Sequence, residues 1–419
     1  MRVLQINSVC GIGSTGRIAA EIQQLLHAGN HECLIAYGRG PVSRDCVGFR
    51  IGSMLSVASH GVYSRLADRH GFGSSGATRR LVGAIEAYAP DVVHLHNLHG
   101  YYLNVELLAH YLHRSQIPVV WTLHDAWAIT GHCAHFESSR CERWKTGCYE
   151  CPLKHEYPRS LVLDRSRDNW RRKREAFAAL NRCVVVVPSV WLARHVADSF
   201  LNACSVHLIR NGVDTETFRY SPSSFRDDYD LVGRRVILAV AGRWTHSKGF
   251  EDVLEVARLL RHADLERRGR EYHRVVMVGL SEKQMRTLPA WITGLPRTSS
   301  ARALAEVYSA ADVFINPTHD DNYPTVNLEA LACGLPVLTY DTGGSGECLL
   351  ESRFGRVVGS SCPSDMVDCI LAGDIHRFDV DDRVRDSLSS HVQMKQYLGV
   401  YRSLVDCRDV CGELGSVYR

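Results

Sequence analysis

Long apolar runs, a charge of one dominant sign and low-complexity tracts are all missing from this chain of 419 residues. No apolar run approaches the roughly 18 residues of a membrane-spanning helix, so we expect no transmembrane segment. The 49 basic and 46 acidic residues leave a formal net charge of +3, which is too balanced for a nucleic-acid-binding protein. The opening MRVLQINSVCGIGS is too short in its apolar run for a signal peptide and predicts a first strand. We therefore expect a cytoplasmic protein.

Cysteine, by contrast, is abundant, with 15 residues. In a reducing compartment most of them are expected to be free core thiols or metal ligands rather than disulfides. Two cysteines separated by two residues, at 148 and 151, have the spacing of half a zinc knuckle. A structural zinc ion is therefore one expectation for this segment, and a packed, reduced loop is the alternative. The candidate ligands are Cys133, Cys141, Cys148 and Cys151, with His132 and His135 as substitutes.

Short apolar runs alternate with helical patterns along the chain, and the same rhythm restarts in the second half. This alternation predicts an α/β fold with two doubly wound, Rossmann-like domains. The punctuation by Asn-Gly-Val-Asp and Ser-Pro-Ser-Ser places the link between them within 210–224. We expect strands at 2–9, 33–37, 91–95, 119–123, 184–187, 236–241, 275–278, 313–316 and 336–340. Helices are expected at 17–27, 250–260, 303–310 and 325–332.

Ligands of such sheets bind outside the carboxyl ends of the strands, so the loops at those ends are the ones to examine. The stretch GRWTHSKG at 242–249 leaves a strand and enters a helix. Arg243 and Lys248 can converge there on one anion, in front of the helix N-terminus, and we expect a pyrophosphate clamp. The alternative is a pair of solvated loop cations. A Walker A loop is excluded, because its glycine spacing and Lys-Ser/Thr pair are missing.

The stretch HDDNYPTVNLEALACGLPV at 319–337 contains two acids separated by seven residues. Pro324 suits the first turn of a helix. Glu329 lies more than a turn inside that helix, where its carboxylate can accept two hydrogen bonds from a ribose diol. Asp321, or its neighbour Asp320, can reach a sugar hydroxyl. A surface position is the alternative for Glu329, but its apolar neighbours favour a buried acid, which needs a partner.

The first half of the chain offers weaker signals. A glycine-rich turn opens a helix after the first strand and could contact a phosphate, through Gly13, Ser14 and Gly16. His124 follows a strand and suits contact with a sugar. A metal held by the histidines at 94, 96 and 99 is an alternative that we do not favour, because they do not share one helix face.

Taken together, the motifs Gly-Arg…Lys-Gly, Asp-Asn-Tyr-Pro-Thr-x-x-x-Glu-Ala-x-Ala-Cys-Gly-x-Pro-Val and Gly-Gly resemble those of the retaining GT-B glycosyltransferases of family 4. The segment TLHDAWAITGHCAHFESSRCERWKTGCYECP is similar to a narrower branch, the bacterial exopolysaccharide enzymes of the colanic-acid type. The resemblance covers nearly the whole chain. It implies two Rossmann-like domains that face a central cleft. It also implies a hexosyltransferase-type enzyme of exopolysaccharide, capsule or O-antigen biosynthesis, with a UDP- or GDP-sugar as donor.

The resemblance also implies roles for individual residues. Arg243 and Lys248 hold the pyrophosphate, Glu329 holds the ribose and His124 contacts the transferred sugar. Asp321 stands where most of the family has glutamate, and Gly346 replaces a proline, so both positions depart from the family. Further donor-binding residues are expected at Asn322, Tyr323, Pro324, Thr325 and Gly279.

The family's domain organisation implies an acceptor-binding domain at 1–210, a donor-binding domain at 211–385 and a helix at 386–419 that packs back on the first domain. Its retention is explained by front-face attack, with no divalent ion required. Two alternatives remain: a metal-dependent GT-A enzyme using Asp379 and Asp381, and a nucleotide-sugar-binding pseudoenzyme with a regulatory or scaffolding role.

The basic segment DRSRDNWRRKRE at 164–175 carries six cations around Trp170. Such a run is usually a solvated helix face. If the acceptor is a glycan linked to polyprenyl diphosphate, the segment could instead rest on an anionic membrane, with the protein peripheral on the inner face of the cytoplasmic membrane. We expect no nucleic-acid partner.

Overall fold

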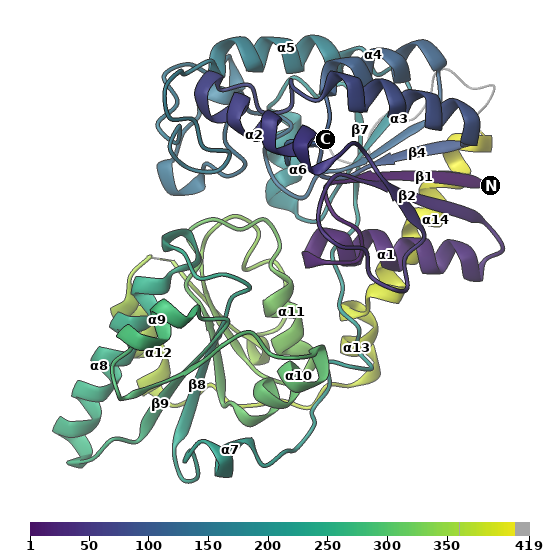
Figure 1. The fold of residues 1–419 in the computed structure, drawn as a ribbon. Coiled ribbons are helices and arrows are strands. Elements are labelled where there is room, and N and C mark those ends of the chain that lie inside the picture. The colour runs from purple at the N-terminus through teal and green to yellow at the C-terminus, as the bar shows by residue number, and fades with distance from the viewer. Residues whose placement is uncertain (360, 407–419) are drawn as a thin grey trace. The chain divides into compact units, whose positions relative to one another are not determined.

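The computed structural model describes residues 1–359 and 361–406. They divide into two compact units (Figure 1). Unit 1 comprises residues 1–210 and the described residues from 393 onward, and unit 2 comprises Asn211–Val392. None of the described helices is both long and apolar enough to cross a membrane.

Unit 1 is built on a parallel sheet of seven strands in the order β3-β2-β1-β4-β5-β6-β7. Its strands are β1 (Arg2–Asn7), β2 (Glu32–Tyr37), β3 (Gly48–Arg50), β4 (Val92–Leu95), β5 (Val119–Thr122), β6 (Cys183–Val187) and β7 (Ser205–Leu208). Its helices are α1 (Gly13–Ala28), α2 (Met54–Ala67), α3 (Ser75–Tyr88), α4 (Val105–Ser115), α5 (Ser166–Ala178), α6 (Val190–Ala197) and α14 (Ser390–Asp406). The strand order reverses direction between β1 and β4, and in doubly wound sheets ligands bind at such a point.

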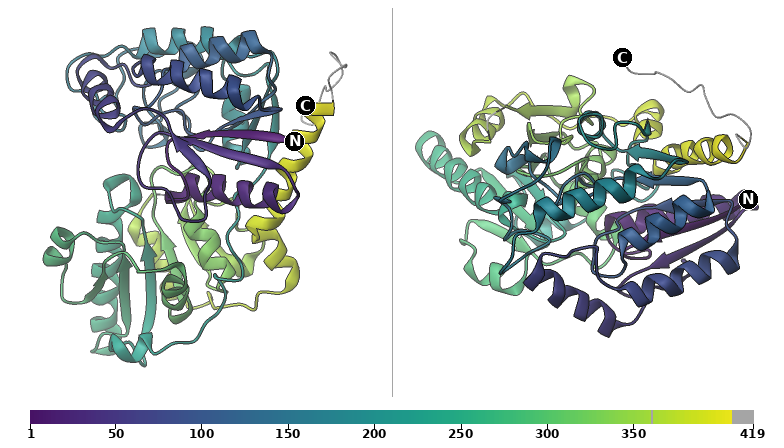
Figure 2. Two further views of the ribbon diagram at one scale, coloured as in Figure 1. Left: turned by 45° about the vertical axis from the view of Figure 1, so that its right-hand side comes forward. Right: turned by 90° about the horizontal axis from the view of Figure 1, so that it is seen from above.

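The two faces of this sheet bury different helices, because successive side chains of a strand point to opposite sides. Val3, Val92 and Val120 pack with α1 and α14 on one face, whereas Leu4, Val93 and Trp121 pack with α3 to α6 on the other. Figure 2 shows α14 running beside the first strands. Its tyrosines fasten it there through bonds from Tyr397 Oη to Thr122 Oγ1 at 3.0 Å and from Tyr401 Oη to His94 Nδ1 at 2.6 Å.

Unit 2 repeats the plan with a parallel sheet of six strands in the order β10-β9-β8-β11-β12-β13. Its strands are β8 (Arg235–Val240), β9 (His273–Val278), β10 (Ile292–Leu295), β11 (Val313–Asn316), β12 (Val337–Tyr340) and β13 (Gly355–Val358). Its helices are α7 (Phe225–Asp228), α8 (Phe250–Arg268), α9 (Glu282–Thr287), α10 (Ala301–Ala310), α11 (Thr325–Ala332), α12 (Pro363–Ala372) and α13 (Asp382–Leu388), with the short 3-10 helices η3 (His246–Lys248) and η4 (Ser352–Phe354). Helices α8 and α12 cover one face, and α10, α11 and α13 cover the other.

Three sequence expectations need correction. Helix α1 begins at Gly13 rather than at residue 17, so the glycine-rich turn forms its first turn. The chain rejoins unit 1 at residue 393 rather than at 386, because α13 buries Val384 and Leu388 in the core of unit 2. Residues 407–419 of the predicted last segment lie outside the described residues.

The third correction concerns α5, the basic helix. Trp170 does not face solvent: it is buried, and its Nε1 donates to the carbonyl of Trp144 at 2.8 Å. Lys173 is buried as well, and Arg172 forms an ion pair with Glu106. Trp170 and Lys173 therefore belong to the interior of unit 1, while Arg165, Arg167, Arg171 and Arg174 are exposed.

Candidate functional site

The carboxyl edge of the sheet in unit 2 brings together the acids and cations of the two motifs. Lys248 ends η3, in the loop after β8, and its Nζ donates to Asp321 Oδ2 at 2.5 Å and to the carbonyl of Asp320 at 3.3 Å. Arg243 lies on the same loop and is exposed. Its guanidinium makes no ion pair in the part of the chain that the structure describes. The Lys248–Asp321 contact was not foreseen from the sequence, which assigned these residues to different parts of a ligand.

Two further contacts fix the loop between β11 and α11, one to the loop after β8 and one to α8. Thr318 Oγ1 donates to the carbonyl of Ser247 at 3.1 Å, and His319 Nε2 lies 3.0 Å from Asp252 Oδ2 on α8. The bond to the Asp252 carboxylate raises the pKa of His319. Sequence reasoning missed this pair, although His319 opens the motif that contains both acids.

Glu329 lies inside α11 and is only 3% exposed. Tyr308 on α10 donates its hydroxyl to Glu329 Oε2 at 3.1 Å. The surface alternative for Glu329 is therefore wrong, and Tyr308 is a partner that a buried carboxylate needs. Pro324 is the N-cap of α11 rather than a residue of its first turn, which begins at Thr325.

The remaining predicted residues of this loop are mostly buried. Asp320, Asn322 and Tyr323 are each less than 9% exposed. The N–H of Asn322 donates to Asp321 Oδ1 at 3.0 Å, and the carbonyl of Tyr323 accepts from Asn211 Nδ2 at 3.1 Å. These bonds hold the carboxylate of Asp321 between a backbone donor and a lysine.

Two glycines permit the close approach of these loops. At Gly343, where φ is +57°, an added Cβ would lie 1.8 Å from the carbonyl oxygen of Asp321. At Gly279, where φ is +93°, it would lie 1.8 Å from the carbonyl oxygen of Ala241. Both positions therefore require glycine. Gly346, which departs from the family pattern, lies against Val357, since an added Cβ would be 2.6 Å from Val357 Cγ2.

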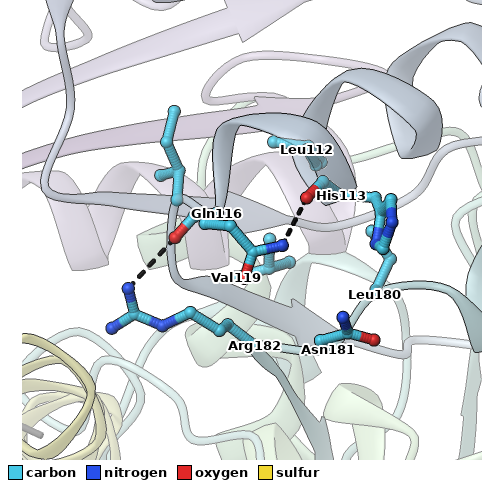
Figure 3. Close-up of a pocket in the computed structure, with 8 residues that line it drawn as sticks. Leu112, His113, Gln116, Val119, Leu180, Asn181 and Arg182 are labelled. Atoms are coloured by element: carbon cyan, nitrogen blue, oxygen red, sulfur yellow. Dashed lines mark hydrogen bonds between the residues drawn. The ribbon is translucent and has the colours of Figure 1, made fainter. Parts of the chain in front are cut away.

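Two cavities lie away from these edges. One, of ≈ 470 Å³, is lined by Ala332, Cys333 and Gly334, so it lies beyond the C-terminal end of α11, opposite the end that follows Pro324. The other is drawn in Figure 3 and lies at the amino ends of β5 and β6, where Arg182 donates to the carbonyl of Gln116 at 3.0 Å. Its ≈ 10 Å³ holds about one water molecule. Neither cavity includes a residue predicted to bind the donor, although Asp379 of the alternative GT-A motif lines the larger one.

In unit 1, the N-terminus of α1 follows β1 at the carboxyl edge of the sheet. Gly13 and Ser14 are exposed there, whereas Gly16 is buried. An added Cβ at Gly16 would lie 3.0 Å from Val9 Cγ2 and 3.2 Å from the N atom of Gly11. Gly16 therefore packs the turn, while Gly13 and Ser14 present the helix N-terminus, which is an anion-binding geometry.

His124 follows β5 at the same edge and belongs to a chain of hydrogen bonds. Its Nε2 lies 3.1 Å from His96 Nδ1, and His96 Nε2 lies 2.9 Å from Gln5 Oε1. The Gln5 amide nitrogen donates to the carbonyl of Ala19 at 2.8 Å, so Gln5 Oε1 must accept. His96 then carries its proton on Nε2 and accepts at Nδ1, and His124 carries its proton on Nε2.

Burial keeps this chain neutral. It lowers the pKa of His124 to about 4 and the pKa of His96 well below its ordinary value. The acceptor nitrogen of His124 is therefore Nδ1, and a neutral imidazole nitrogen of this kind can accept from a hydroxyl group. Sequence reasoning found His124 but missed the roles of Gln5 and His96.

Lys173 of α5 holds the loop after His124 in place through hydrogen bonds. Its Nζ donates to the carbonyls of Trp127 at 2.7 Å and Thr130 at 3.0 Å, and lies 3.3 Å from the centroid of the Trp127 ring. Burial lowers the pKa of Lys173 to about 7. Beside this loop, Asp125 Oδ2 pairs with His99 Nε2 at 2.7 Å, and this contact lowers the pKa of Asp125.

The four cysteines of the predicted zinc segment lie near one another in unit 1. The Cys133 thiol is hydrogen-bonded to Cys151, which lowers the pKa of Cys151 to about 7, and Cys148 Sγ accepts from the N–H of Gly131 at 3.1 Å. Cys141 is partly buried against the same core. His132 is instead hydrogen-bonded to Asp68, whose Oδ1 lies 2.5 Å from His132 Nδ1. Within 1–359 and 361–406, no group of three or more histidine, cysteine or acidic side chains is arranged to hold a metal ion. The zinc site stays a prediction.

One acid of the alternative GT-A motif, Asp381, has a structural role. Asp381 is the N-cap of α13, where Oδ1 accepts from the N–H of Val384 at 2.9 Å. Its other oxygen pairs with Arg353 at 3.2 Å.

Two family models match the sequence. The model described as Glycosyltransferase Family 4 matches residues 15–217, and the one described as Glycosyl transferases group 1 matches residues 234–372. Sucrose-phosphate synthase from Thermosynechococcus elongatus superposes with a TM-score of 0.68 over 97% of this chain and 100% of that chain, at 16% identity. The protein is a GT-B glycosyltransferase. The expectations of an α/β fold and of a hexosyltransferase-type enzyme are thereby confirmed.

Two further proteins are similar to this glycosyltransferase. WcaC of Escherichia coli (strain K12), whose name assigns it to colanic acid biosynthesis, is 25% identical over 96% of this chain and 100% of its own length. HepE of Anabaena, solved in complex with UDP and glucose, superposes with a TM-score of 0.64 at 13% identity and covers 96% of this chain and 99% of its own. The likeness to HepE, at 13% identity, concerns the fold alone.

Proposed function

We propose that this glycosyltransferase moves a hexose, with retention, from a UDP- or GDP-sugar to a glycan acceptor linked to polyprenyl diphosphate. The observation that carries the proposal is the edge of unit 2, where Arg243 and Lys248 share a loop and Lys248 reaches Asp321. The buried Glu329 lies on the helix that follows. The name of WcaC supports a role in exopolysaccharide biosynthesis, and the HepE structure in complex with UDP and glucose supports a nucleotide-sugar donor.

In the proposed reaction, negative charge develops on the leaving diphosphate as its bond to the sugar breaks. Arg243 and Lys248 stabilise this charge. Glu329 accepts from the ribose hydroxyls. His124, with its acceptor Nδ1, and Asp321 contact the transferred sugar. The leaving phosphate accepts the acceptor's proton on the same face of the sugar, which accounts for retention. Since protein cations meet the phosphate charge, we propose that no divalent ion is required.

In the free enzyme the Asp321 carboxylate is paired with the ammonium group of Lys248. When a diphosphate binds, we propose that Lys248 turns from Asp321 to the phosphate and leaves the carboxylate to the sugar. The ion pair therefore holds Lys248 in place before the donor arrives.

A ligand panel tests the donor assignment. The purified protein is screened by thermal shift against UDP, GDP, ADP and CDP, and then for hydrolysis of the matching nucleotide-sugars with and without chelator.

Arg243→Ala and Lys248→Ala should each weaken the affinity for the preferred diphosphate roughly ten- to 150-fold, because a hydrogen bond to a charged group contributes roughly 1.5–3 kcal/mol. Arg258→Ala is the control, since Arg258 pairs with Glu255 on the exposed face of α8. Unchanged diphosphate affinity in both site variants would contradict the clamp, and activity lost to chelator and restored by magnesium would contradict the metal-independent step.

A further inference from the structure

Helix α2 of unit 1 buries polar residues and exposes apolar ones, the reverse of an ordinary surface helix. Its buried residues are His60 and Ser64. His60 Nδ1 lies 3.0 Å from Ser74 Oγ, and its Nε2 accepts from the N–H of Gly73 at 3.1 Å. Five apolar or aromatic side chains of the helix are between 46 and 82% exposed: Met54, Leu55, Val62, Tyr63 and Leu66. Spacings of seven and four residues put 55, 62 and 66 on one face.

A second apolar segment, Leu161, Val162 and Leu163, lies against the end of this helix. The N–H of Leu161 donates to the carbonyl of Arg65 at 2.7 Å, and the N–H of Leu163 donates to the carbonyl of Leu66 at 3.3 Å. All three side chains are at least 41% exposed. The two segments therefore form one continuous surface, which we call the α2 surface. In Figure 1, α2 lies at the outside of unit 1, beside the loops that precede α5.

The edge of the α2 surface is cationic. Arg65 on the helix and Arg159, Arg165 and Arg167 around the second segment are all exposed. Asp164 lies among them, but its two oxygens accept from the N–H groups of Cys151 at 2.6 Å and Ser166 at 2.9 Å. Asp68, at the end of α2, is buried against His132. Glu156 is the remaining acid between 151 and 167 and is outnumbered by the four arginines.

We propose that the α2 surface docks on an anionic phospholipid membrane. A contiguous group of exposed apolar side chains marks an interaction site, and an apolar centre bordered by arginines matches the interface between acyl chains and anionic headgroups. The arginines also argue against a second copy of this chain as the occupant, because a symmetric contact would bring like charges together. The docking surface itself is inferred from exposed apolar side chains and charge. Only its purpose, access to a lipid-linked acceptor, rests on the proposed function.

Vesicle co-sedimentation of the full chain tests the docking. The protein is mixed with vesicles of phosphatidylcholine alone or of phosphatidylcholine and phosphatidylglycerol, at low and high salt. Leu55→Ser combined with Leu66→Ser should lower binding to the anionic vesicles at least about tenfold, because each leucine loses apolar surface buried in the membrane. Val232→Ser combined with Leu350→Ser is the matched control, since these side chains are 66 and 65% exposed in unit 2. Arg65→Gln combined with Arg165→Gln should weaken binding at low salt and have less effect at high salt.

Binding that requires anionic lipid and falls only in the α2-surface variants supports the proposal. It is overturned by absence of co-sedimentation, by equal loss in the control variant, or by a wild-type dimer in sedimentation velocity that the Leu55→Ser and Leu66→Ser changes abolish. Nucleotide-sugar hydrolysis without vesicles should stay unchanged in these variants. A protein that binds vesicles but hydrolyses no nucleotide-sugar would contradict the proposed donor and leave the docking surface standing.

Discussion

At the scale of single residues, the two acids of unit 2 lie in different environments and should respond differently to loss of charge. Glu329 is buried beside Tyr308, whereas Asp321 pairs with Lys248. Glu329→Gln should weaken both free nucleoside diphosphate and intact donor about tenfold, since the amide accepts less well from ribose hydroxyls. Asp321→Asn should lower turnover without weakening the diphosphate, because removing the carboxylate leaves Lys248 free for phosphate. Calorimetry with the diphosphate, beside turnover for each variant, makes the comparison.

If Asp321→Asn weakens the bare diphosphate as much as Glu329→Gln does, the two acids do not divide their work in this way. The melting temperature of each variant is the control. Glu329→Gln keeps an acceptor for Tyr308, so a large loss of stability would point to a structural role instead.

The hydrogen-bond chain from Gln5 through His96 to His124 predicts that His96 acts through its neighbour. His96→Phe removes the acceptor for His124 Nε2, so the proton of His124 is no longer fixed on that nitrogen. Turnover should fall about ten- to a hundredfold, equivalent to about 1.4–2.7 kcal/mol, while diphosphate affinity stays the same. In His96→Asn the amide oxygen can accept from His124 and should restore part of the turnover. Equal turnover in wild type and His96→Phe would exclude the positioning role.

At the scale of elements, the site of unit 2 depends on how closely its loops approach. Gly343→Ala would place a Cβ 1.8 Å from the carbonyl oxygen of Asp321, at a φ of +57°. We expect the free energy of unfolding to fall by at least about 1–3 kcal/mol, and turnover to fall through displacement of the Asp321 loop. Gly83→Ala is the control: it lies within α3 with no atom within 4 Å of the added Cβ, so stability should rise by up to about 1 kcal/mol. Urea denaturation measures both, and equal stability of Gly343→Ala and wild type would show that the loop adapts.

The strands that the sequence did not predict have a common physical feature. Strands β3, β7, β10 and β13 have exposed or partly exposed residues at half or more of their positions, so they lack the apolar run that marks a strand buried on both faces. Central strands such as β4, β5 and β12 are buried at every position, and these were predicted within a few residues. In the basic run of α5, Trp170 and Lys173 are buried while Arg167, Arg171 and Arg174 are exposed. A count of cations does not reveal which side of a helix is buried.

At the scale of the whole molecule, unit 1 should lose stability in acid. Burial lowers the pKa of several histidines of unit 1, and most strongly that of His60, His70, His94, His96 and His124. The unfolded chain binds protons at these groups near their ordinary pKa of about 6.5, while the folded chain does not until near pH 4 or below. Stability is therefore fully present above pH 6.5 and falls as the pH drops from about 6.5 toward 4, by up to about 1.4 kcal/mol per histidine and pH unit.

Urea denaturation at pH 7, 6 and 5 measures this effect. His60→Asn should reduce the slope of stability against pH, because one depressed group is removed. A free energy of unfolding that stays constant from pH 7 to pH 5 would show that these histidines are protonated within the fold.

The sequence by itself determined the two parallel sheets and the loops at their carboxyl ends, because periodicity and motif spacing are local properties of the chain. The motifs in these loops also predicted Arg243, Lys248, Asp321, Glu329 and His124 as site residues. Only the tertiary structure decided the partners of these residues. Lys248 meets Asp321 because β8 and β11 are neighbours in the sheet although 73 residues separate the two side chains. His124 meets His96 because β4 pairs with β5. A sequence states which groups can form a hydrogen bond, but burial and strand order decide which of them do.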